Sequence, residues 1–125
     1  MDIQSLQTFN LDRKELLLTV LSLITGLIHV YVGYTSGFDT LTLAGLGFFG
    51  GTLIFLGNYF RNLVVTASIP YTAIQFVFYY RTYGLEFGPL AAVDKAVQAL
   101  FIVLGIYYLS KRYRLSDSPK DFLMN

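Results

Sequence analysis

The chain has 125 residues, enough for one domain, and it is strongly apolar: 54% of its residues are hydrophobic and only 14% are charged. A soluble domain carries about 25% charged residues, and so short a chain could not hide this much apolar area from water. The net charge of +1 points to no nucleic-acid partner, and the lack of cysteine excludes disulfides and thiolate metal sites. We therefore expect a single membrane domain over residues 1–125.

Four apolar stretches follow one another, each near the ~20 residues that cross about 30 Å of hydrocarbon. They cover residues 16–34, 41–59, 63–80 and 89–109. None shows the two-residue alternation of a membrane barrel, and a helix satisfies its own backbone hydrogen bonds in lipid. The sequence therefore predicts an all-α integral membrane four-helix bundle. A tail over residues 110–125 follows the last stretch, and its residues 116–125 are expected to be mobile or to lie on the membrane surface.

Local signals predict how these helices begin and bend. Asp12 and Glu15 have capping-box spacing, so the first helix is expected to start about one turn before its apolar stretch. Pro89 suits the first position of the fourth helix. Pro70 lies inside the third stretch and removes a backbone donor, which predicts a kink there.

The lysine and arginine residues predict the orientation, because cytoplasmic loops carry an excess of them. Only Arg81 and Lys95 fall on one side of the predicted membrane. The other side holds Arg13, Lys14, Arg61, Lys111, Arg112, Arg114 and Lys120. We therefore expect a multi-pass protein of the cell membrane with cytoplasmic N and C termini.

Small and polar residues at three- and four-residue steps predict the packing faces, because lipid does not drive apolar helices together. These stripes comprise Thr19, Ser22, Gly26, His29 and Gly33; Ala44, Gly47 and Gly51; Ser68, Thr72, Gln75 and Tyr79; and Ala91, Asp94, Gln98, Phe101 and Gly105. The spacing is typical of a left-handed bundle. Gly47 and Gly51 form a GxxxG pair that we expect inside the bundle, the alternative being a homo-oligomer face.

Three stripe residues are predicted to form one polar layer. His29 and Gln75 each lie five residues from a tyrosine at the end of their stretch, and Asp94 lies five residues after Pro89. At 1.5 Å per residue, each is about 7–8 Å below the outer membrane edge. Gln98 is one turn deeper, whereas Lys95 is expected to point away and extend to the outer surface.

This layer has two interpretations. Ionisable groups meeting inside a membrane indicate a site for protons, a cation or a ligand, with His29 titrating and Asp94 as its partner. Alternatively, the groups hydrogen-bond one another and fix the helix register, or Asp94 reaches water or pairs with Arg81. One histidine without cysteine supplies no conventional transition-metal site, so we expect no metal and no cofactor.

Four phrases of the sequence carry a resemblance. They are residues 26–33, 45–51, 69–75 (IPYTAIQ) and 93–98 (VDKAVQ). Over residues 16–109 they resemble a family of small, uncharacterised four-helix membrane proteins from halophilic archaea. The resemblance implies an archaeal four-helix membrane fold, and it implies no activity.

With no complete catalytic set, we expect a non-catalytic structural or accessory subunit of a larger membrane assembly rather than an enzyme. Its partners would be the lipid bilayer and either other membrane proteins or further copies of the chain. The alternative is a small oligomeric proton or cation transporter or channel component that uses His29, Gln75, Asp94 and Gln98. A third interpretation is a quinone- or lipid-binding subunit of a membrane enzyme.

Overall fold

The computed structural model describes residues 11–37, 39–57, 59–83 and 88–124, most of which are helical and none of which lies in a strand. The helices are α2 (Arg13–Ser36), α3 (Asp39–Leu56), α4 (Arg61–Tyr83), α5 (Pro89–Arg114) and α6 (Pro119–Met124). The prediction of an all-helical chain is therefore confirmed. Four of these helices, α2 to α5, are long and apolar enough to cross a membrane.

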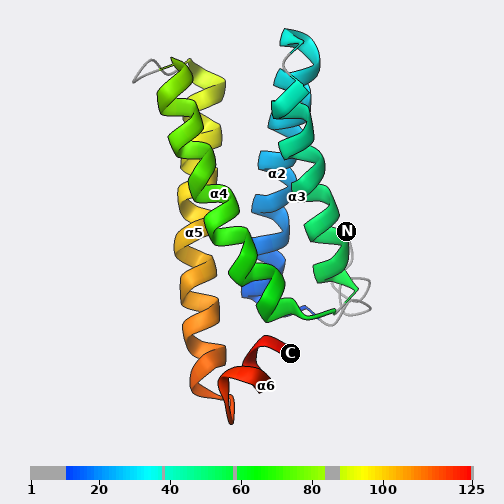
Figure 1. Cartoon of the computed structure of the whole chain (residues 1–125), viewed down its shortest axis with the longest axis vertical. Helices are drawn as coiled ribbons and strands as arrows, with labels where there is room; N and C mark the ends of the chain where they lie inside the picture. The colour runs from blue at the N-terminus through cyan, green and yellow to red at the C-terminus, as the bar shows by residue number, and fades with distance from the viewer. Residues whose placement is uncertain (1–10, 38, 58, 84–87, 125) are drawn as a thin grey trace.

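The four long helices run alternately up and down, with α2 beside α3 and α4 beside α5 (Figure 1). These two pairs meet mainly through α2 and α5, whereas α3 and α4 touch much less. The start of α2 and the end of α5 lie at the same end of the molecule, which is the lower end in Figure 1. The short helix α6 lies across that end and contacts α4 and α5.

Capping explains where α2 begins and ends. Asp12 accepts a hydrogen bond from the Glu15 backbone, and the Glu15 side chain accepts one from the Asp12 backbone, so the predicted capping box is present. At the other end Gly37 adopts a left-handed conformation with φ of 73° and donates its N–H to the Gly33 carbonyl. The helix is therefore longer at both ends than the apolar stretch over residues 16–34.

Other boundaries also differ from the prediction: α3 begins at Asp39 rather than at residue 41, and α4 covers Arg61–Tyr83 rather than residues 63–80. Helix α3 ends at Leu56 rather than near residue 59, because the chain turns at Gly57 and at Phe60, whose φ is 50°. Helix α5 continues to Arg114, five residues beyond the predicted end at residue 109. Pro70 lies within α4, which is assigned as one helix from Arg61 to Tyr83, and the kink stays a prediction.

Within the tail, which was expected to be mobile or to lie on the membrane surface, residues 119–124 form the helix α6, which packs on α4 and α5. The Ser118 hydroxyl accepts a hydrogen bond from the Asp121 backbone near the start of α6. Phe122 is buried, with its ring edge-on to Tyr113 at a centroid distance of 5.4 Å. One aromatic anchor thus holds the segment against α5.

Large apolar side chains project outward from all four long helices. Leu27, Leu43, Leu53 and Val103 are each more than 60% exposed, and they come from α2, α3, α3 and α5. The buried core is small by comparison and lies towards the end where α6 docks. It comprises Leu18, Phe55, Val65, Phe101 and Tyr108. Such a surface is suited to hydrocarbon rather than to water.

Glycine allows the close approach of α2 and α3. A Cβ added to Gly45 would lie 2.7 Å from the Gly26 carbonyl oxygen, and one added to Gly33 would lie 2.5 Å from the Thr42 backbone nitrogen. Both contacts are with backbone atoms, which cannot move aside as a flexible side chain can. The seam between these helices therefore depends on the absence of a side chain at Gly45 and Gly33.

The two glycines of the GxxxG pair, expected at a seam inside the bundle, have different surroundings. A Cβ on Gly47 would clash with Tyr71 of α4, so this glycine lies at a contact between two helices, whereas a Cβ on Gly51 would meet nothing within 4 Å. Helix α3 buries Gly45, Phe48, Thr52 and Phe55, and it packs mainly on α2.

The glycine geometry predicts a contrast between two alanine substitutions. Gly45→Ala should lower the free energy of unfolding by about 1–3 kcal/mol, because the methyl group would push α3 away from α2. Gly105→Ala should change it by less than about 0.5 kcal/mol, since a Cβ there meets Ile69 and Val65 at an ordinary 3.5 Å. Thermal or denaturant unfolding in detergent micelles would compare the two variants, and equal losses would contradict the argument.

Candidate functional site

The predicted polar layer centres on Thr25, His29 and Asp94. The Thr25 hydroxyl donates to the Asp94 carboxylate at 2.6 Å, and His29 Nδ1 lies 2.8 Å from the Thr25 carbonyl oxygen. Because a carbonyl can only accept, Nδ1 carries a proton. The same nitrogen is 3.6 Å from Asp94 Oδ1, and all three residues are buried. Asp94 is thus held by two neighbours on α2.

Two glutamines extend this layer across the bundle. Gln98 Nε2 donates to Gln75 Oε1 at 2.8 Å and to the Thr25 hydroxyl at 3.2 Å. Gln75 in turn donates to the Tyr71 carbonyl at 3.2 Å. The amides therefore tie α5 to both α4 and α2 at one depth. The structure brings His29, Gln75, Asp94 and Gln98 together, and their use as a binding site stays a prediction.

Lys95 was expected to point away from this layer, but its ammonium group turns into it. Nζ lies 2.9 Å from Gln98 Oε1 and 3.6 Å from Asp94 Oδ2, and the side chain is only 12% exposed. It also lies 5.0 Å from the ring centroids of Phe76 and Tyr79. A carboxylate, an amide oxygen and two aromatic faces attract the cation more than the outer surface does.

The basic neighbour of Asp94 is Lys95 and not Arg81, with which a pairing was one expected alternative. Asp94 is 5% exposed and has Thr25, His29 and Lys95 as its neighbours, while Arg81 is exposed. Lys95 is therefore the basic partner of Asp94 within the layer.

One turn from Gln75 along α4, the Thr72 hydroxyl has no partner. The residue is fully buried, and among the described side chains no other buried nitrogen or oxygen atom lacks a hydrogen bond. The remaining polar groups of the layer are paired, as buried polar groups usually are. Most of the described buried polar groups therefore form hydrogen bonds within the chain.

A second buried cluster, not predicted as a site, lies near the end covered by α6, with Glu15 at its centre. The Glu15 Oε2 atom accepts from the Tyr108 hydroxyl at 2.9 Å and from Arg61 Nη1 at 3.3 Å, with Arg112 Nη1 at 4.0 Å. Glu15 is 4% exposed and Arg61 is 3% exposed. One carboxylate thereby joins α2, α4 and α5.

Asn62 links this ionic cluster to α6. Its Nδ2 donates to the Phe122 carbonyl at 2.7 Å, and its Oδ1 accepts a hydrogen bond from Arg112 Nε. Arg112 also lies over the Tyr108 ring, with 5.1 Å from Cζ to the centroid. The side chains of this cluster therefore come from α2, α4 and α5. Helix α3 contributes a backbone group, the Phe55 carbonyl, which accepts from Arg61 Nε at 2.9 Å.

The sequence did contain a signal for this second cluster. The predicted stripes continue in register to Glu15 on α2 and to Tyr108 and Arg112 on α5. Glu15 was interpreted as a capping residue, and Arg61 and Arg112 as residues that set the orientation. The helices extend past those stretches, which brings the same faces together for another turn.

Comparisons with protein-family models, with curated proteins and with solved structures find no match to this chain. Among the described residues, no three His, Cys, Asp or Glu side chains lie together as metal ligands would. The fold and the two clusters thus define the class of the protein: an all-helical chain with four potential membrane spans and a largely self-paired polar interior.

Proposed function

We propose that the protein spans the cell membrane four times, with cytoplasmic termini, and acts as a non-catalytic structural or accessory subunit of a membrane assembly. The proposal keeps the predicted orientation, in which Arg61, Lys111 and Arg112 mark the cytoplasmic end. The outward leucines and valines support the bilayer as solvent, since a soluble chain would bury them. The resemblance to four-helix proteins of halophilic archaea belongs to the same proposal.

The observation that carries the non-catalytic role is the pairing of the buried charges within the chain. Asp94 lies beside Lys95 and His29, and Glu15 beside Arg61. A catalytic or transporting group must be able to meet a substrate, whereas these groups bind one another and hold the helices in register. These interactions therefore serve to fix the arrangement of the four long helices.

The test is extraction from the native membrane in a mild detergent, followed by measurement of the particle mass and of the polypeptides present. An accessory subunit should be recovered in a particle clearly heavier than one 14.1 kDa chain with its detergent, together with a second polypeptide in fixed stoichiometry. Recovery of the chain alone, as a monomer and with no loss of stability, would contradict the proposal.

A second candidate function is proton transfer, and one specific observation favours it. Buried polar side chains follow one face of α2 between the two clusters: Glu15, Thr19, Ser22, Thr25 and His29. At 1.5 Å per residue this line spans about 21 Å, a large part of the hydrocarbon thickness. Against it, the Thr19 and Thr52 hydroxyls donate to helix carbonyls rather than along the line.

Reconstituted vesicles with an imposed pH gradient distinguish the two functions. The accessory role predicts that wild-type protein adds no proton flux over empty vesicles. Proton transfer predicts a flux that His29→Ala and Asp94→Asn abolish while the protein stays folded. A flux with that dependence would replace the accessory role.

A further inference from the structure

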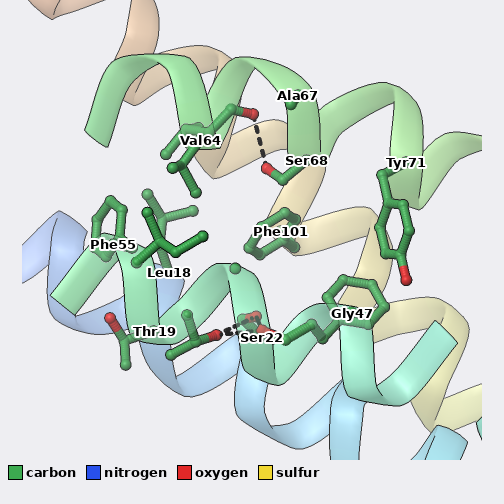
Figure 2. A pocket seen from close by; sticks show the side chains of 15 residues that line it. Leu18, Thr19, Ser22, Gly47, Phe55, Val64, Ala67, Ser68, Tyr71 and Phe101 are labelled. Carbon is green, nitrogen blue, oxygen red and sulfur yellow. Dashed lines mark hydrogen bonds between the residues drawn. The ribbon is translucent and has the colours of Figure 1, made fainter. Parts of the chain in front are cut away.

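The bundle contains a cavity of about 280 Å³ between α3 and α4. Its floor comes from the other two helices and includes Leu18 and Ser22 of α2 and Phe101 of α5, which are all buried. Figure 2 shows these side chains lying between the ribbons, with Gly47 and Ala67 on the two walls. The cavity exists because α3 and α4 touch much less than the other neighbouring pairs of long helices do.

Side chains connect α3 and α4 near both ends of this cavity. At one end Tyr71 reaches from α4 and donates to the Ala44 carbonyl of α3 at 2.7 Å. At the other, the Arg61 guanidinium covers the Phe55 ring at 5.2 Å from its centroid and donates to the Phe55 carbonyl. Phe55 and Tyr71 stand at opposite ends in Figure 2. A ligand is therefore expected to enter from the side.

The side opening faces the apolar exterior. Ile54 on α3 is 49% exposed and Ala67 on α4 is also exposed, although both line the cavity. Along α3 the cavity extends from Phe55 to Gly47, about 12 Å at 1.5 Å per residue. This length fits within one leaflet of a bilayer whose hydrocarbon core is about 30 Å thick.

The hydroxyl groups that line the cavity have no proton left for a ligand. Thr19 donates to the Glu15 carbonyl, Thr52 to the Phe48 carbonyl and Ser68 to the Val65 carbonyl, at 2.7–2.8 Å. The Ser22 hydroxyl lies 2.8 Å from the Thr52 hydroxyl, and the Tyr71 hydroxyl donates to the Ala44 carbonyl. Among the described residues that line the space none is charged, and Arg61 lies behind the Phe55 ring at one end. The cavity cannot donate hydrogen bonds to a quinone carbonyl or a phosphate, but it can enclose a hydrocarbon.

We propose that this cavity binds the hydrocarbon chain of a membrane lipid, which enters sideways between α3 and α4. It is larger than the ~150 Å³ apolar cavities that stay dry and take up benzene, and an occupant restores dispersion contacts that an empty space lacks. The inference rests on the proposed insertion in a membrane and is independent of any accessory role. The ligand chemistry shared by the candidate lipids is a hydrocarbon chain, which can be unbranched or branched.

The test is photolabelling in nanodiscs of phosphatidylcholine doped with a lipid that carries a diazirine in its hydrocarbon chain. One arm uses an unbranched acyl chain and the other a branched isoprenoid chain, so the more strongly labelling arm identifies the source. Peptide mapping should find label on the floor residues Leu18 and Phe101 as well as on the outward Leu53, which is 70% exposed. Label on Leu53 but not on the floor, in both arms, overturns the proposal.

Two neighbouring glycines provide matched variants. Gly51 lines the cavity and Gly50 does not, while a Cβ on either would meet nothing within 4 Å. Gly51→Phe should lower floor labelling roughly tenfold by filling the space with a phenyl ring, and Gly50→Phe should leave it unchanged. Equal floor labelling in the two variants contradicts the site. An absence of label on Leu53 as well would show that the membrane insertion itself is wrong.

Discussion

Glu15→Ala is expected to lower the free energy of unfolding by about 3–5 kcal/mol, the cost of breaking a buried ion pair from one side. The substitution removes the acceptor of both the Arg61 guanidinium and the Tyr108 hydroxyl. Arg61 would remain 97% buried with its positive charge unbalanced by Glu15. Chemical unfolding in detergent micelles, followed by far-UV circular dichroism, measures the change.

Two control variants separate the ion pair from general effects of substitution. Arg114→Ala removes an exposed charge on the same end of α5 and should change stability by less than about 0.5 kcal/mol. The double variant Glu15→Met with Arg61→Met leaves neither charge, so it should lose less than the sum of the two single losses. A Glu15→Ala loss no larger than that of Arg114→Ala would show that the cluster contributes little.

Asp94→Leu is expected to have the second largest effect, about 3 kcal/mol or more, for the same electrostatic reason. Lys95 would keep only the Gln98 oxygen and the Phe76 and Tyr79 rings around its ammonium group. The Thr25 hydroxyl would also lose the carboxylate to which it donates. Unfolding in the same micelles, at a pH where Lys95 is charged in water, measures the loss.

The control for Asp94 is its adjacent cation. Lys95→Met combined with Asp94→Leu should recover a large part of the stability lost by Asp94→Leu alone, because no unpaired charge is then left in the interior. The single variant Lys95→Met measures how far Asp94 depends on its neighbour. Strictly additive losses would mean that the two side chains do not interact energetically.

Much of the fold followed from the apolar stretches, because hydrocarbon leaves a chain few ways to satisfy its backbone. The polar layer could also be located, since His29, Gln75 and Asp94 share a predicted depth, Gln98 lies one turn deeper, and all four lie on packing faces. The direction in which a long side chain points was harder to predict from the sequence. Lys95 has a long flexible side chain whose head follows local charge rather than the position of its Cα, and the sequence does not show that charge.

The rotation of each helix against its neighbours was the second feature that the sequence did not predict. A GxxxG pair shows that a helix can be approached closely, but it does not say by which partner. Here Gly45, one position of the same glycine-rich run, faces α2, while Gly51 faces open space. The second cluster was missed because the ends of apolar stretches were taken as the ends of the packed faces. Both errors concern how one helix is rotated or extended against the next.

The contact between Asn62 and the Phe122 carbonyl joins residues 60 positions apart, and Glu15 meets Tyr108 across 93 positions. During synthesis α2 is therefore made before every side-chain partner of its Glu15 carboxylate. Arg61 precedes Tyr108 and α6 in the chain, so it can meet Glu15 while α5 is still to be made. The network at this end is complete only after α6 has been made, so its assembly is a late step compared with the packing of α2 against α3.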